Sequence, residues 1–105
     1  MKLVMTLISA VALTALAAPA SAAMDGAALY KDKTCNACHG PKGDKPLMPN
    51  YPKVAGQNAA YIEQQMKDIK SGARNNGQTA AMKGVMHLVN DEEIKALADY
   101  LSKLK

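Results

Sequence analysis

The stretch "CNACHG", residues Cys35 to Gly40, contains both cysteines of this 105-residue chain and one of its two histidines. Cysteine and histidine at this spacing occur in three kinds of site: a redox-active dithiol, a zinc centre, and the C-x-x-C-H motif that attaches a c-type haem. Each kind of site makes a different demand on the surrounding chain. The cluster is therefore interpreted together with the segments that precede and follow it.

The N-terminal segment has the pattern of a secretory signal peptide. Lys2 precedes an uncharged, apolar run from Leu3 to Ala18, and small residues follow this run up to Ala23. The run is shorter than the ~20 residues that span a bilayer, and an Ala-Ser-Ala cleavage pattern follows it closely. Residues 1–22 are therefore predicted to be a signal peptide, cleaved after Ala22 or Ala23. The mature chain would then be exported, to the periplasm if the source is bacterial.

The remaining part, residues 23–105, is predicted to be a single small domain with a weak core. The chain has four tyrosines but no tryptophan and no phenylalanine. Chains of this size bury only about 60% of their unfolded surface and often need a covalent or metal staple. A disulfide between Cys35 and Cys38 would close too short a loop to stabilise the fold much. The sequence therefore lacks a bulky apolar group that its fold requires.

Helical signals occur in three segments, and no strand pattern is present. Asp25 and Asn58 are placed to cap the first two helices. Asn90 and Glu93 have the spacing of a capping box at the start of the third helix. The predicted helices cover residues 26–34, 59–71 and 91–104.

Two long loops separate these helices. Residues 40–56 contain four prolines and several glycines, which exclude a helix there. Residues 73–89 are expected to form a second loop, with one short helical turn around residues 82–87. Loops of this length in a small domain are usually functional, so both are expected to contribute to the site.

The dithiol and the zinc centre fit this chain poorly. A redox-active dithiol is expected in a βαβ context, and the pattern contains no strands. Cys35, Cys38, His39 and His87 could supply four zinc ligands. His87, however, lacks a second ligand at the paired spacing of such sites, and the adjacent Cys38 and His39 would strain a shared tetrahedron.

The haem-attachment motif fits better. One helical turn separates Cys35 from Cys38, so both thiols can form thioethers with the vinyl groups on one edge of a porphyrin. His39 then lies beneath the ring as an iron ligand. Haem would also supply the missing bulky core, and an exported chain suits its covalent attachment.

A second axial ligand has several candidates in the sequence. Met66 lies on the apolar face of its predicted helix and is expected to fill the core. Met48 follows His39 too closely and is expected at the haem rim or exposed. The candidates far enough along the chain to return over the opposite face are Met82, Met86 and His87.

Three segments together resemble one protein family. "DGAALYK…CNACHG", "PNYPKVAGQNAAYIEQQMKDIKSGAR" and "MKGVMHLVNDEEIKALADYLSKL" are similar to the class I monohaem cytochromes c of bacterial periplasms. The similarity extends to the short single-haem forms and to the halves of dihaem cytochromes c. It implies an all-α, small cytochrome c fold in which three main helices and loops wrap around one covalently bound haem c.

The resemblance also assigns roles to individual residues. In this family the axial methionine stands eight residues before the cap of the last helix, which implies Met82, with Met86 as the alternative. A proline carbonyl holds the second ring nitrogen of the axial histidine, which implies Pro49, with Pro52 as the competitor. The first and last helices cross at a small residue and an aromatic one, here Gly26 and Tyr100.

The implied function is that of an electron carrier and not of an enzyme. His/Met ligation leaves no open iron site, so the expected chemistry is outer-sphere transfer of one electron. The resemblance implies a cytochrome bc-type complex as donor and an oxidase or a reductase as acceptor, and a monomeric carrier. The mature chain has 12 basic and 9 acidic residues. The lysines expected to border the haem crevice, and either to steer an acidic partner or to form a solvated surface, are Lys42, Lys45, Lys53 and Lys83.

Two other functions remain open from the sequence. A haem peroxidase or gas-binding protein would require a labile or absent sixth ligand, and a zinc-stapled binding module would require the metal in place of haem. Nucleic acid is not an expected partner, because the basic residues are scattered and lack stacking aromatics. Stable membrane insertion is not expected after removal of the signal peptide.

Overall fold

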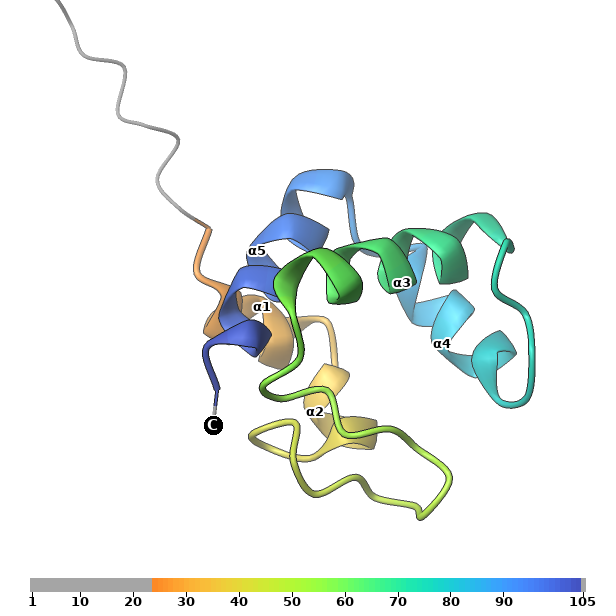
Figure 1. The fold of residues 1–105 in the computed structure, drawn as a ribbon, viewed down its shortest axis with the longest axis horizontal. Coiled ribbons are helices and arrows are strands. Elements are labelled where there is room, and N and C mark those ends of the chain that lie inside the picture. The colour runs from red at the N-terminus through yellow and green to blue at the C-terminus, as the bar shows by residue number, and fades with distance from the viewer. Residues whose placement is uncertain (1–23, 105) are drawn as a thin grey trace, which may run out of the picture.

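The structure, a computed structural model, describes residues 24–104 as five α-helices joined by loops, with no strand in that range (Figure 1). The signal peptide predicted at residues 1–22 lies outside the described residues. The helices are α1 (Gly26–Asp32), α2 (Cys35–His39), α3 (Ala59–Ser71), α4 (Thr79–Met86) and α5 (Asp91–Ser102). The three main helices expected from the sequence are therefore present as α1, α3 and α5.

The residues expected to cap these helices do so. The Asp25 carboxylate accepts hydrogen bonds from the backbone at the start of α1, and the Asn58 side chain does the same for α3. At α5, the backbone N–H of Glu93 donates to Asn90 Oδ1 at 2.8 Å, and the backbone N–H of Asn90 donates to Glu93 Oε1 at 3.0 Å. Gly72 ends α3 with a left-handed φ of 89°, a conformation that glycine adopts without strain.

Two short helices occur where the sequence analysis expected other structure. The first predicted helix, residues 26–34, stops at Asp32, because Thr34 adopts a left-handed φ of 64° and separates α1 from α2. The polar stretch 73–89 is also more ordered than expected. It contains the two-turn helix α4 in place of one short turn, and the buried Thr79 hydroxyl donates to the Asn76 carbonyl at the start of α4. Both helices carry residues of the predicted site.

The crossing of α1 and α5 depends on a glycine. A Cβ atom on Gly26 would lie 2.7 Å from the Ala96 carbonyl oxygen and would also overlap the Tyr100 side chain. The rings of Tyr30 and Tyr100 pack beside this crossing with their centroids 6.0 Å apart. The predicted contact between Gly26 and Tyr100 is therefore present, and it brings the N-terminal and C-terminal helices together.

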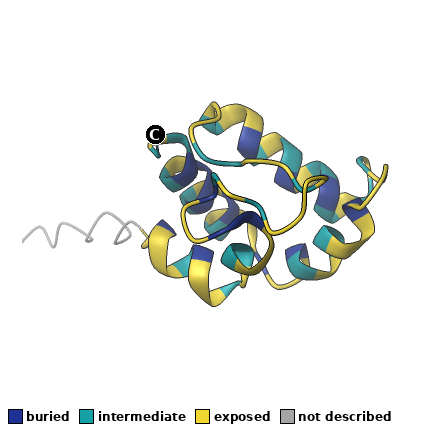
Figure 2. Ribbon diagram, turned by 90° about the horizontal axis from the view of Figure 1, so that it is seen from below, coloured by how far each residue is buried: buried dark blue, intermediate teal, exposed yellow. Residues whose placement is uncertain are grey.

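The core lies where α3 and α1 pack against α5, and the buried positions face the interior (Figure 2). In addition, α3 packs on α4 and α1 packs on α2. The buried apolar residues are Tyr30, Ile62, Met66, Ile69, Met86, Val89, Ile94, Leu97, Ala98 and Leu101.

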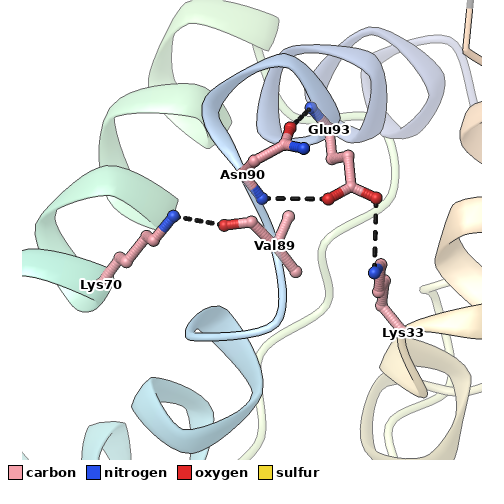
Figure 3. A network of polar contacts seen from close by, with 5 residues as sticks. All are labelled: Lys33, Lys70, Val89, Asn90 and Glu93. Atoms are coloured by element: carbon pink, nitrogen blue, oxygen red, sulfur yellow. Dashed lines mark hydrogen bonds and ion pairs between the residues drawn. The ribbon is translucent and has the colours of Figure 1, made fainter.

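A polar network joins four segments at the start of α5 (Figure 3). Glu93 pairs with Lys33, after the end of α1, at an N–O distance of 3.4 Å. Lys70 of α3 donates to the carbonyl of Val89, in the connection between α4 and α5. Together with the Asn90 capping box, these contacts hold the segments before α2 and after α4 against the same end of α5.

Candidate functional site

A cavity of about 370 Å³ opens between α2, α3, α4 and the loop at residues 50–57. Its size is in the range of small-molecule and cofactor sites. Its apolar wall comes mainly from α3 and α4, and α2 supplies the reactive side chains. Seven of the candidate residues named from the sequence line the cavity: Cys35, Cys38, His39, Pro52, Lys53, Met66 and Met82.

The two thiols lie one helical turn apart on α2. Both cysteines are free; Cys35 is half-buried and Cys38 is exposed. Burial is the main factor that raises the pKa of the Cys35 thiol, to about 11. A thiol with such a pKa is a poor nucleophile at neutral pH, which argues against a redox-active dithiol. The geometry is that of two attachment points facing one cavity.

His39 is buried and held by a backbone carbonyl. Its side chain is 7% exposed, and its Nδ1 lies 2.9 Å from the carbonyl oxygen of Pro52. The prediction that Pro49 makes this contact is therefore wrong. A turn from Met48 to Tyr51, closed by a hydrogen bond of 3.0 Å, leaves Pro49 exposed and brings the chain back to His39 only at Pro52.

The contact orients the imidazole. With Nδ1 donating to the Pro52 carbonyl, Nε2 is left as the ring nitrogen available to a metal, the arrangement usual for metal-bound histidines. The backbone at the end of α2 is fixed from both sides, because the Tyr30 hydroxyl donates to the Gly40 carbonyl and the Leu47 N–H donates to the Cys38 carbonyl. The Tyr30 side chain is itself buried, and burial is the main factor that raises the pKa of its hydroxyl to about 12.

The two candidate methionines of α4 have different surroundings. Met82 is partly buried and lines the cavity. Met86 is 1% exposed, belongs to the core, and is not part of the cavity wall. Met66 is buried as expected and reaches the cavity from α3, whereas Met24 and Met48 are largely exposed. Met82 is thus the methionine of α4 that faces the space above α2.

The four residues considered for zinc do not come together. His87 follows the end of α4, is exposed, and does not line the cavity that Cys35, Cys38 and His39 share. Within residues 24–104, no group of three or more His, Cys, Asp or Glu side chains is arranged to hold a metal ion. An iron held by a porphyrin needs only the axial ligands from the protein, so this arrangement suits haem better than a bare metal.

One wall of the cavity was not identified from the sequence. It consists of polar side chains from the end of the loop before α3, from α3 itself and from the loop between α3 and α4, namely Gln57, Tyr61, Gln65, Arg74, Asn76 and Gln78. The sequence feature that could have indicated this wall is Arg74, the only arginine of the chain, which lies in a polar stretch directly after the glycine that ends α3.

The cavity as a whole fits a haem in composition as well as in geometry. Two thiols and an imidazole lie on one side, the Met82 thioether lies on α4, and apolar side chains lie between them. Lys53 and Arg74 contribute positive charge, and none of the cavity-lining residues is an aspartate or a glutamate. A large apolar macrocycle that carries carboxylates matches both properties.

Comparisons with known proteins agree with this site. Residues 23–105 match the family model described as cytochrome c. Cytochrome c-553 of Nitratidesulfovibrio vulgaris (strain Miyazaki F) is 38% identical over 99% of this chain and 100% of its own length. Cytochrome c4 of Pseudomonas aeruginosa is also 38% identical over 99% of this chain, but the chain spans only 49% of that protein.

A solved structure shows the same fold. The crystal structure of reduced cytochrome c4 from Pseudomonas stutzeri superposes with a TM-score of 0.69 and 34% identity, over 79% of this chain and 48% of that one. Family, fold and cavity together show that this chain belongs to the cytochrome c family and that Cys35, Cys38 and His39 form its motif for covalently bound haem c.

Proposed function

We propose that the protein is a one-electron carrier with His39 and Met82 as the axial ligands of a single haem c. The observation that carries the proposal is the position of these two side chains in one cavity, His39 on α2 and Met82 on α4. When bound, the haem iron supplies the one-electron redox chemistry. The chain's own residues hold, orient and shield it.

The role of His39 follows from its hydrogen bond. The Pro52 carbonyl fixes the tautomer and the ring orientation, and a hydrogen bond of this kind makes the other ring nitrogen a stronger donor. Because the acceptor is a backbone oxygen, the orientation does not depend on the protonation of another side chain. His39 can then keep one geometry in both oxidation states.

Met82 would supply a neutral sulfur on the opposite face. A thioether ligand favours the reduced iron more than a second imidazole does, so His/Met ligation raises the reduction potential. The same ligand fills the sixth position and excludes small molecules from the iron. The alternatives, a haem peroxidase or a gas-binding protein, require this position to be open, and the place of Met82 in the cavity wall disfavours them.

We further propose that electrons pass through the edge of the cavity near Cys38, to and from redox proteins. Cys38 is exposed, and the neighbouring loop presents Leu47 with 73% of its surface exposed. Lys42, Lys45 and Lys53 are also exposed and could attract an acidic partner. The expected partners are a cytochrome bc-type donor and an oxidase or a reductase as acceptor, with the carrier itself a monomer.

The proposed site of action is the periplasm, reached through the signal peptide predicted at residues 1–22. Among residues 24–104, no helix is long and apolar enough to cross a membrane. The names of two relatives agree with a role in electron transfer; one is the thiosulfate dehydrogenase electron acceptor of Thiomonas intermedia, 40% identical over 85% of this chain and 38% of its own length.

A redox titration combined with carbon monoxide binding tests the proposal. The purified haem protein should follow a one-electron Nernst curve, and its reduced form should not bind carbon monoxide at neutral pH. Rapid formation of a carbon monoxide complex by the wild-type protein would show an open or labile sixth position and would favour the gas-binding or peroxidase function.

A further inference from the structure

An Asn-Gly pair lies in the loop that leads from α3 into α4. Asn76 and Gly77 are both exposed, and Figure 1 shows this loop curving around the end of the molecule that lies opposite the C-terminus. Both residues also line the haem cavity. Asparagine is among the thermolabile residues of proteins, and a following glycine leaves the next backbone nitrogen unshielded because it has no side chain. The pair is therefore a candidate for deamidation.

The reaction needs only water. The backbone nitrogen of Gly77 attacks Cγ of Asn76, so that a new C–N bond forms and the C–N bond to the side-chain amide breaks. The proton of the Gly77 nitrogen is taken up by water or hydroxide, and the departing amide takes a proton from water and leaves as ammonia. Water then opens the succinimide ring to give aspartate or isoaspartate. One water molecule is consumed and one ammonia molecule is released.

The attacking nitrogen of Gly77 is free to react. Among residues 24–104, its N–H donates to no acceptor. Gly77 has a left-handed φ of 56°, and a Cβ atom built on it would meet nothing within 4 Å. The backbone is therefore neither tied into a helix at this point nor covered by a neighbouring side chain, and both of these would slow the attack.

Thr79 activates the same peptide unit. The Asn76 carbonyl, which is conjugated with the Gly77 nitrogen, accepts one hydrogen bond from the Thr79 backbone N–H at 3.1 Å and a second from the Thr79 hydroxyl. Thr79 is only 7% exposed, so these bonds act in a medium of lower dielectric than water. Donors on the carbonyl oxygen stabilise the negative charge that spreads over the peptide unit when its nitrogen loses a proton. Thr79 thus favours the nucleophilic form of the Gly77 nitrogen.

The product would change the charge of the haem cavity. None of the cavity-lining residues is an aspartate or a glutamate, so a carboxylate in place of the Asn76 amide would be the first acidic side chain in that wall. We propose that Asn76 is a site of spontaneous deamidation, promoted by Thr79, and that the resulting carboxylate lowers the reduction potential of the haem. The deamidation follows from the loop alone, whereas its effect on the potential rests on the haem function proposed above.

The size of the effect follows from electrostatics. Negative charge near the iron favours Fe(III) over Fe(II). Arg74, which lines the cavity together with Asn76, offsets part of the new charge. The redox equilibrium should therefore shift toward the oxidised form by roughly twofold to tenfold, where tenfold corresponds to about 59 mV for one electron.

The first experiment follows deamidation of the haem-loaded protein by peptide mass spectrometry during incubation at mildly alkaline pH. Asn75 is the internal control, because it is also exposed but is followed by asparagine in place of glycine. Asn76 should be modified well before Asn75. Thr79→Val should slow the reaction at Asn76 about tenfold, since it removes a hydrogen bond to a developing charge, and Thr79→Ser should restore the rate. In urea, where the loop is unfolded, the wild type and Thr79→Val should react at the same rate.

The second experiment measures the reduction potential of Asn76→Asp, which reproduces one product of the reaction. Asn75→Asp is the matched control: it adds the same charge one residue away, and Asn75 lines an outer hollow but not the haem cavity. The potential should fall in Asn76→Asp and fall less in Asn75→Asp. The near-red absorption band is recorded in parallel, so that a loss of Met82 from the iron is distinguished from an effect of charge.

Three results would overturn the proposal. Modification of Asn76 no faster than that of Asn75 would show that the loop is not a reactive site. Equal rates for the native wild type and Thr79→Val would remove the role of Thr79; if Thr79→Val does not fold, Gly77→Ala, whose Cβ shields the nitrogen, takes its place, and an undiminished rate there would contradict the mechanism. Equal potentials for Asn76→Asp and the wild type, with the band intact in both, would show that the carboxylate does not act on the iron.

Discussion

At the scale of single residues, the site is fixed by contacts between side chains and backbone carbonyls. The His39 imidazole faces the Pro52 carbonyl, and the Tyr30 hydroxyl donates to the Gly40 carbonyl, one residue after the attachment motif. The Arg74 backbone N–H is bound to the Asp68 carbonyl. Backbone acceptors do not titrate, so the geometry around the haem is insulated from ordinary changes of pH.

The Tyr30 hydroxyl gives a prediction for alkaline pH. Its pKa is about 12, raised mainly by burial, above the usual value near 10. A group whose folded pKa is raised stabilises the fold below its unfolded pKa, and this stabilisation is lost as the pH rises through the folded pKa. Stability should therefore fall between about pH 10 and pH 12. Thermal melts of the haem protein across this range should show a smaller fall in Tyr30→Phe.

The same variant can be checked spectroscopically. An absorbance titration of the tyrosines should lose its latest-titrating component in Tyr30→Phe, whereas Tyr61→Phe, which changes an exposed ring on α3, should leave that component in place. If all four tyrosines of the wild type titrated together near pH 10, the hydroxyl of Tyr30 would not be buried in solution.

The residue that holds His39 shows where sequence reasoning stopped. Residue spacing and the family resemblance indicated the haem-attachment motif, a proline as the hydrogen-bond partner of His39, and the position of Met82 at the cavity. They did not decide between Pro49 and Pro52, because both prolines lie in one proline-rich loop. A tight turn from Met48 to Tyr51 decides which carbonyl returns to α2, and sequence spacing does not encode where that turn closes.

At the scale of helices, the fold depends on the α1–α5 crossing and on the junction at the start of α5. Gly26 lets the two helices approach, and the Asn90–Glu93 capping box begins α5 where Lys33 and the Val89 carbonyl also meet (Figure 3). The capping residues could be predicted from the sequence, since each acts on its own helix. Helix α4 could be predicted only in part, because its buried face is defined by contacts with α3.

The crossing predicts a large effect of one methyl group. Gly26→Ala places a Cβ against the Ala96 carbonyl and Tyr100, so the helices must separate, at a cost of about 1–3 kcal/mol of stability. Gly84→Ala, within α4, meets no atom within 4 Å and should be neutral or slightly stabilising. Thermal or denaturant unfolding of both haem proteins measures the difference; equal stabilities would contradict the tight crossing.

The Glu93 carboxylate at the start of α5 predicts that the stability of the fold depends on pH in the acid range. Hydrogen bonding to the Asn90 backbone and the proximity of Lys33 lower the pKa of Glu93. A lowered folded pKa stabilises the fold above the unfolded pKa, near 4.3, and this stabilisation is lost as the pH falls through the folded value. The melting temperature of Glu93→Gln should therefore fall less between pH 6 and pH 3 than that of the wild type.

Glu63→Gln is the control for this experiment. Glu63 also pairs with a lysine, Lys67, but this pair lies on the surface of α3 and does not join segments. Its removal should leave the acid dependence close to that of the wild type, because surface pairs contribute little. Identical acid profiles for Glu93→Gln and the wild type would exclude a stabilising role of the junction carboxylate.

At the scale of the whole molecule, the haem is expected to complete the core. The core between α1, α3 and α5 is small and contains tyrosine as its only aromatic residue type, and a cavity of about 370 Å³ separates α2 from α4. The absence of Trp and Phe from the chain already indicated that a bulky group was missing. The polar wall at Arg74 could not be foreseen in this way, because its members become neighbours only after α3 and its following loop have folded.

The missing core predicts that folding requires the cofactor. A Cys35→Ser/Cys38→Ser variant, which cannot attach haem covalently, should have little helical circular dichroism and no cooperative melt when purified without haem. The haem-loaded wild type should melt cooperatively. A native-like cooperative transition in the haem-free variant would show that the polypeptide alone provides a sufficient core.

If His39 and Met82 ligate one haem iron, the oxidised protein should show the near-red absorption band that reports a sulfur ligand on the iron. Met82→Leu and Met86→Leu keep the side-chain volume, which matters for Met86 because it is buried in the core. We expect the band in the wild type and in Met86→Leu, and its loss in Met82→Leu. Loss of the band in Met86→Leu with its retention in Met82→Leu, or its absence from the wild type, would show that Met82 is not the iron ligand.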